Sequence, residues 1–133
     1  MKPKIDMITV PVKSLEVSNK FYRDLIRVSE DQISSGDNHT AFLLDGGMSL
    51  VLFEHVAFAQ MTDQKEDLIF SSLILTHTAE SEAEVCEILQ MAEQAGGIII
   101  KKAIRDEWSF KGCFKDPDGH IWEILAWNNN QPI

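Results

Sequence analysis

The feature that most constrains the fold of this chain is an order of predicted elements that occurs twice. Residues 5–12 alternate and are rich in β-forming side chains, which predicts a strand. Ser14 can cap a helix after this strand, because its hydroxyl can accept a hydrogen bond from the first helical turn. Glycine- and aspartate-containing turns then separate three short predicted strands, at residues 29–35, 40–44 and 48–53.

The second half of the chain predicts the same order of elements. Residues 69–78 form an apolar, β-branched run that is typical of a strand. Ser81 and Glu84 have the spacing of a capping box, and Gly96 is placed to end the helix that follows. Three further strands are predicted, at residues 98–102, 108–114 and 120–127.

A single offset of 67 residues aligns the two halves. It places Ser14 on Ser81, and residues 7–9 on residues 74–76. A helix start and a strand therefore coincide under one shift, which indicates a duplicated unit.

The length of 133 residues suits one domain with a substantial core. We therefore expect a single domain made of two units. The first covers about residues 5–54, a linker covers 55–68 with a short helix at 56–61, and the second covers about 69–127.

Charge and composition exclude several kinds of partner. The chain carries 12 Lys and Arg against 21 Asp and Glu, a formal charge of −9, which argues against nucleic acid and anionic membranes. The charge is compatible with a cationic ligand, or it serves solubility alone. No apolar run approaches the roughly 20 residues of a membrane helix. Two cysteines and no apolar leader favour the cytoplasm.

The last predicted hairpin contains a carboxylate in an apolar strand. Residues 116–119, Asp-Pro-Asp-Gly, have the chemistry of a tight turn. Glu123 follows among Ile121, Trp122 and Ile124, where a carboxylate needs a partner, a metal ion or water.

The doubled strand–helix–three-strand order, closing on Asp-Pro-Asp-Gly-His-Ile-Trp-Glu at residues 116–123, resembles the vicinal oxygen chelate superfamily. This superfamily includes glyoxalase, bleomycin-resistance and extradiol dioxygenase proteins, and the resemblance runs from residue 5 to about residue 127. It implies an α+β fold in which two tandem βαβββ units form curved mixed sheets around a cavity, with the helices on the outer face. It also implies a homodimer.

Metal-using members of the superfamily place His or Glu ligands on the first and last strand of each unit. The matching positions of this chain hold Met7, Ile74, Val51 or Leu52, and Glu123. Only Glu123 is a suitable ligand for a hard divalent ion. Glu54 and His55 are remote substitutes. We therefore expect no bound cofactor, with a divalent metal as the alternative.

Strand alternation predicts which side chains line the implied cavity. Glu123 is the candidate general acid or base, and a structural ion pair with Arg105, Lys111 or Lys115 is its alternative role. The candidate ligand-binding residues are Met7, Thr9, Ser72, Ile74, Thr76, Trp108, Phe110, Leu125 and Trp127.

Two classes of function follow from this lining. The first is a protein of the bleomycin-resistance kind that binds a small, partly aromatic or cationic ligand in an apolar cavity without catalysis. The second is a lyase, isomerase or dioxygenase-type enzyme that uses Glu123 with a divalent metal or as a general base. A relative kept only for interaction with another protein is a third possibility.

Overall fold

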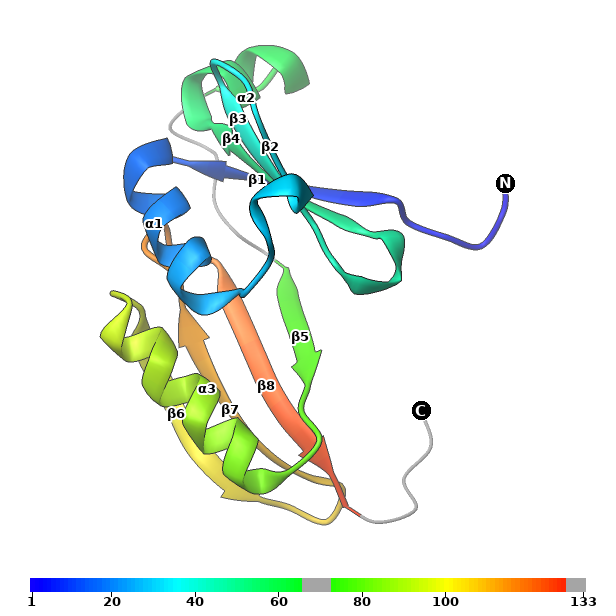
Figure 1. Cartoon of the computed structure of the whole chain (residues 1–133), viewed down its shortest axis with the longest axis vertical. Coiled ribbons are helices and arrows are strands. Elements are labelled where there is room, and N and C mark those ends of the chain that lie inside the picture. Colours follow the sequence, from blue (N-terminus) through cyan, green and yellow to red (C-terminus); the bar gives the residue numbers. More distant parts are fainter. Residues whose placement is uncertain (66–72, 129–133) are drawn as a thin grey trace. The chain divides into compact units, whose positions relative to one another are not determined.

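The computed structural model describes residues 1–65 and 73–128. The chain divides into two compact units, Met1–Phe70 and Ser71–Ile133. Within each unit a helix packs on one face of a four-stranded sheet (Figure 1).

The first unit contains one mixed sheet with the strand order β1-β4-β3-β2. The β1 and β4 strands are parallel, and the other pairs are antiparallel. Its elements are β1 (Met7–Val12), α1 (Leu15–Leu25), η1 (Glu30–Gln32), β2 (Ile33–Ser35), β3 (His39–Leu43), η2 (Asp45–Gly47), β4 (Ser49–Glu54) and α2 (His55–Thr62).

The second unit repeats this plan with the order β5-β8-β7-β6, in which β5 and β8 are parallel. Its elements are β5 (Ile74–Thr78), α3 (Glu82–Gln94), β6 (Ile98–Arg105), β7 (Ser109–Lys115) and β8 (Ile121–Trp127). The predicted α+β class with two tandem βαβββ units is confirmed.

Both principal helices begin as their sequences predict. The Ser14 hydroxyl accepts a hydrogen bond from the Val17 amide at 3.2 Å. At α3 the Ser81 hydroxyl accepts from the Glu84 amide at 3.1 Å, while the Glu84 carboxylate accepts from the Glu80 amide at 2.9 Å. Gly96 follows the end of α3 with a φ of 111°, a conformation that glycine adopts without strain.

The core of each unit lies between its helix and its sheet. In the first unit Phe21 and Tyr22 of α1 are buried, and the Tyr22 ring lies 6.3 Å from the ring of Phe42. In the second unit α3 packs on β6, β7 and β8, where the rings of Phe114 and Trp122 stack with centroids 6.2 Å apart. Aromatic burial of this kind dominates the stability of a small core.

Three local predictions have different outcomes. Residues 29–35 were expected to be one strand, but Glu30–Gln32 form a 3-10 helix because the Gln32 side chain accepts a hydrogen bond from the Ser29 amide at 3.0 Å. The expected helix at residues 56–61 is confirmed as α2. The strand expected at residues 69–78 is present as β5, which begins at Ile74. Residues 66–72, which belong to the expected linker and to the start of this strand, lie outside the described residues.

Candidate functional site

The second sheet has one face that α3 covers and one face that no helix among residues 73–128 covers. We call the latter the helix-free face. Paired residues of neighbouring strands point to the same side of a sheet, so the register assigns each residue to a face. Gly112 lies under α3, because a Cβ atom there would lie 2.7 Å from Leu89 Cδ1. Alternation from Gly112 therefore places Cys113 and its partner Glu123 on the helix-free face.

One row of paired residues crosses all four strands of this face. We call it the polar row, and it consists of Thr76 on β5, Glu123 on β8, Cys113 on β7 and Lys101 on β6. Thr76 Oγ1 donates a hydrogen bond to Glu123 Oε1 at 3.3 Å, and the Glu123 side chain is 22 % exposed. The sheet thus holds a carboxylate beside a hydroxyl and a thiol.

Lys111 approaches Glu123 from the next row of β7. Its Nζ atom lies 4.0 Å from Glu123 Oε2 and 3.9 Å from Asp106 Oδ2. Both distances are at the outer limit of an ion pair, so neither carboxylate holds the ammonium tightly. Of the three cations that the sequence offered as partners of Glu123, Lys111 therefore lies within ion-pair distance of its carboxylate. Arg105 instead pairs with Glu82 of α3.

The charged side chains around Cys113 change the pKa of its thiol. Burial raises the pKa of the Cys113 thiol, and the negative charge of Glu123 raises it further. The positive charges of Lys101 and Lys111 act in the opposite direction on the same pKa. All three charged side chains therefore act on one thiol, which is a poor nucleophile near neutral pH.

The first sheet contains an equivalent row without this chemistry. Thr9 pairs with Val51 in the same register in which Thr76 pairs with Glu123, so Val51 is the counterpart of Glu123. Met7 and Ile74 are also apolar. Within residues 1–65 and 73–128, no three His, Cys, Asp or Glu side chains lie together as a metal ion would require. This donor set does not fit the ligand pattern expected of a hard divalent ion.

Glu54 has a structural role at the start of α2. Its carboxylate oxygens accept hydrogen bonds from the amides of Val56 at 3.0 Å and Ala57 at 2.9 Å. These bonds, led by the one from Ala57, lower the pKa of Glu54. His55 Nε2 lies 3.7 Å from Glu54 Oε1. The carboxylate is therefore engaged as a helix cap.

The predicted site residues are divided between the two units. Met7 and Thr9 lie together on β1, and Trp108 precedes β7 with 55 % of its surface exposed. Ser72 lies outside the described residues. The helix-free face brings together Glu123 with Ile74, Thr76, Leu125 and Trp127.

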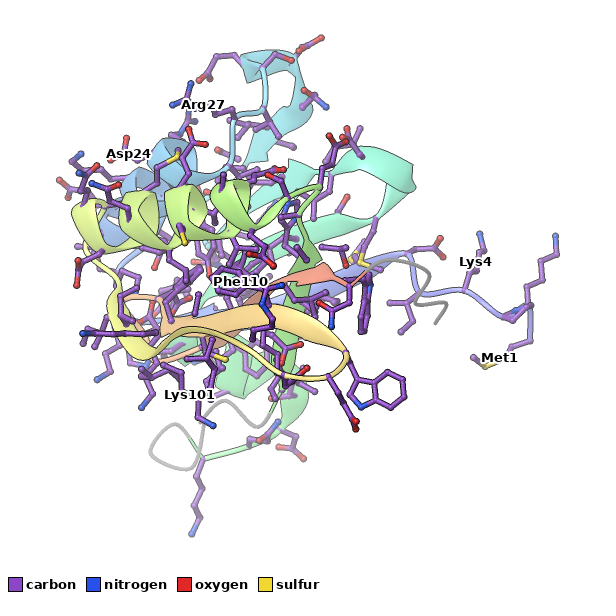
Figure 2. All side chains as sticks on the ribbon, turned by 90° about the horizontal axis from the view of Figure 1, so that it is seen from below. Met1, Lys4, Asp24, Arg27, Lys101 and Phe110 are labelled. Carbon is purple, nitrogen blue, oxygen red and sulfur yellow. The ribbon has the colours of Figure 1, made fainter. Side chains whose placement is uncertain are left out.

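Phe110 differs from the expectation that it lines the same face as Glu123. It pairs with Ala126 and Arg105, and the Arg105 guanidinium lies 5.8 Å from its ring centroid. Figure 2 shows Phe110 on the α3 side of the sheet and Lys101 on the other side. Ser109 is the residue of β7 that pairs with Trp127, so Ser109 shares the face of Glu123 and Trp127. Alternation then places Phe110 on the opposite face.

The sequence named Lys111 as a possible ion-pair partner of Glu123, but it did not identify Lys101 or Cys113 as members of the site. The period-two spacing of Lys111 and Cys113 could have placed them on one face with Lys115. Lys101 could not be placed in this way, because the register between β6 and β7 shifts on both sides of it.

Comparison with known proteins agrees with this architecture. The family model of the Glyoxalase/Bleomycin resistance protein/Dioxygenase superfamily matches residues 4–124. The chain belongs to this superfamily. Members of the superfamily bind small molecules and often form oligomers.

Solved structures of the same fold include three informative examples. A glyoxalase-related enzyme from Fulvimarina pelagi has a TM-score of 0.85 at 24 % identity, over 98 % of this chain and 92 % of that chain. A hypothetical protein from S. aureus has a TM-score of 0.80 at 20 % identity, over 95 % and 94 %. Lactoylglutathione lyase from Agrobacterium tumefaciens has a TM-score of 0.68 at 17 % identity, over 93 % of each chain. A comparison with curated proteins found no significant match.

In the described part of the chain, no helix combines the length and apolar character needed to cross a membrane.

Proposed function

We propose that this superfamily member binds a small, partly aromatic ligand on the helix-free face of its second sheet. The observation that carries the proposal is the position of Glu123, a carboxylate that lies on the same face as Leu125 and Trp127. An apolar surface with a few polar groups at fixed positions is the usual composition of a small-molecule site. Exposure of 62 % at Ile74 and 36 % at Trp127 leaves apolar surface for a ligand to cover.

Tryptophan fluorescence tests this proposal. An aromatic ligand that stacks on Trp127 should quench its emission, so a panel of aromatic, cationic and anionic compounds should include quenchers. Replacing Trp127 with Phe should remove most of the quenching. The matched control is Trp122→Phe, which changes the ring stacked on Phe114 on the α3 side and should leave the quenching in place. Absence of quenching by every compound would contradict the proposal.

A second candidate function is catalysis by Glu123 in a lyase, isomerase or dioxygenase-type reaction. The hydrogen bond from Thr76 orients the carboxylate, and Glu123 could then accept or return a proton at Oε1 or Oε2 as a general acid or base. A solved structure of the same fold is named lactoylglutathione lyase, which supports considering this class.

Metal analysis separates the metal-dependent form of this second candidate from the first. Because Glu123 alone matches the expected ligand pattern, we expect purified protein to hold far less than one divalent ion per chain after dialysis. The test is elemental analysis of the wild type and of Glu123→Gln. A stoichiometric ion that is lost in Glu123→Gln would overturn this expectation and favour the metal-dependent enzyme.

We also propose that two copies of the chain form a homodimer in the cytoplasm. Met7 is 57 % exposed and Leu43 is 45 % exposed, and both lie in one row of the first sheet with Ser49 between them. A second copy would remove such apolar surface from water. Analytical ultracentrifugation measures the association, and a monomer at all concentrations would contradict it.

A further inference from the structure

The two sheets can be compared row by row, because their strands pair in the same order. The polar row of the second sheet holds Thr76, Glu123, Cys113 and Lys101. The equivalent row of the first sheet holds Thr9, Val51, Ala41 and Ser34. Threonine occupies the first place in both rows, but the ionisable side chains occur only in the second. The two units therefore share a framework but differ in this row, which carries ionisable side chains only in the second unit.

The charge on the helix-free face is positive, although the whole chain carries −9. The paired positions of β6 and β7 place Lys101, Lys111 and Lys115 on this face, against the carboxylate of Glu123 and that of Asp106, which lies 3.9 Å from Lys111 Nζ. An ion near the face responds to these local charges more than to distant ones, because salt screens charges beyond about 8 Å. The face therefore favours an anion.

Two of these lysines are available to a ligand. Among residues 1–65 and 73–128, the ion pairs of the structure do not include Lys101. The ion pairs of Lys111 have N–O distances of 3.9 and 4.0 Å. Lys101 pairs with Cys113 across β6 and β7, and Lys111 lies two residues before Cys113 on the same face of β7. They therefore flank one point of the sheet.

We propose that the polar row and Lys111 form a site for an oxyanion, such as a carboxylate, that belongs to the ligand of the helix-free face. Lys101 and Lys111 contact the oxyanion through charge-assisted hydrogen bonds. Glu123 accepts a hydrogen bond from an N–H or O–H group of the same ligand, while Trp127 contacts its apolar body. This inference rests on the proposed ligand-binding function and names the chemical class of the ligand.

Isothermal titration with three naphthalene compounds tests the inference, because they share one ring system and carry an anionic, a neutral or a cationic substituent. The probes are naphthoate, naphthamide and naphthylmethylammonium. Naphthoate should bind about tenfold more tightly than naphthamide, since two partly exposed lysines each contribute about threefold. Added salt should reduce this difference.

Two variants and a matched control locate the effect. Lys101→Gln and Lys111→Gln should each weaken naphthoate binding about threefold and leave naphthamide binding unchanged. Lys20→Gln is the control, because it makes the same change in net charge on α1, where Lys20 pairs with Asp24 at 2.9 Å. It should leave the binding of both compounds unchanged.

The outcomes separate the two proposals. Equal binding of naphthoate and naphthamide, or tighter binding of naphthylmethylammonium, would overturn the oxyanion site and leave the proposed function intact. Loss of naphthoate affinity in Lys20→Gln as large as in Lys101→Gln would also overturn the oxyanion site. If none of the three compounds binds, the proposed function fails, and the oxyanion site fails with it.

Discussion

At the scale of single residues, Gly112 marks the closest approach between α3 and its sheet. A Cβ atom at this position would lie 2.7 Å from Leu89 Cδ1, 2.9 Å from the Lys101 carbonyl oxygen and 3.0 Å from the Ala103 amide nitrogen. Two of these neighbours are backbone atoms, which cannot rotate away. The absence of a side chain at residue 112 therefore allows β6, β7 and α3 to pack as they do.

Gly112→Ala should reduce the free energy of unfolding by about 1–3 kcal/mol, measured by urea denaturation. The comparison variant is Gly36→Ala, whose three nearest neighbours would all be atoms of the His39 ring, the first at 2.5 Å. That ring can turn away from its stack on Phe53, at a cost of about 0.5–1.5 kcal/mol. A Gly112→Ala protein as stable as the wild type would contradict the close approach of α3 and β6 to Gly112.

Residue-scale reasoning from the sequence succeeded where strand alternation alone decided the outcome. It placed Glu123, Leu125 and Trp127 on one face of the last strand, and the register agrees. It misplaced Phe110, because the pairing of β7 with β8 depends on the length of the turn between them, which alternation does not specify.

At the scale of elements, α2 illustrates how a carboxylate can define a helix terminus. Glu54 ends β4 and also caps α2 through the amides of Val56 and Ala57. The sequence predicted the helix from its apolar composition but not its cap, because Glu is not among the residues preferred at that position.

Glu54→Ala should reduce the free energy of unfolding by about 0.5–1 kcal/mol at neutral pH. The effect should depend on pH, because hydrogen bonds from Ala57 and Val56 lower the pKa of Glu54 in the folded chain. The ionised cap therefore contributes fully above the pKa of an unfolded glutamate, about 4.3, and the contribution disappears as the pH falls through the lower folded value. Urea denaturation of both proteins from pH 7 downward measures the difference. A difference that grows on acidification would contradict the capping role.

The composition of the helix-free face depends on strand register, which the sequence does not predict as well as it predicts the order of elements. The order of strands and helices was predictable from hydrophobic period and turn residues, so the doubled plan was recognised. The register shifts around Lys101 in β6 were not, because a β-bulge leaves little trace in the residue pattern. The polar row depends on the pairing of Lys101 with Cys113 across β6 and β7, which the sequence pattern does not specify.

At the scale of the whole molecule, the two units have the same framework and different surface chemistry. Thr9 and Thr76 are equivalent, but their neighbours are Val51 and Glu123. Membership of the superfamily therefore fixes the framework, whereas the ligand must be inferred from the side chains of this chain. We therefore propose that the ligand lies on the helix-free face of the second unit.

Two-dimensional NMR of nitrogen-labelled protein titrated with naphthoate tests this claim most directly, through the indole N–H signals of Trp127 and Trp122. Trp127 lies on the helix-free face, whereas Trp122 lies on the α3 side and stacks on Phe114. The Trp127 signal should shift in a saturable manner, and the Trp122 signal should move little. A saturable shift of Trp122 with an unchanged Trp127 signal, or no shift of either signal, would contradict this claim.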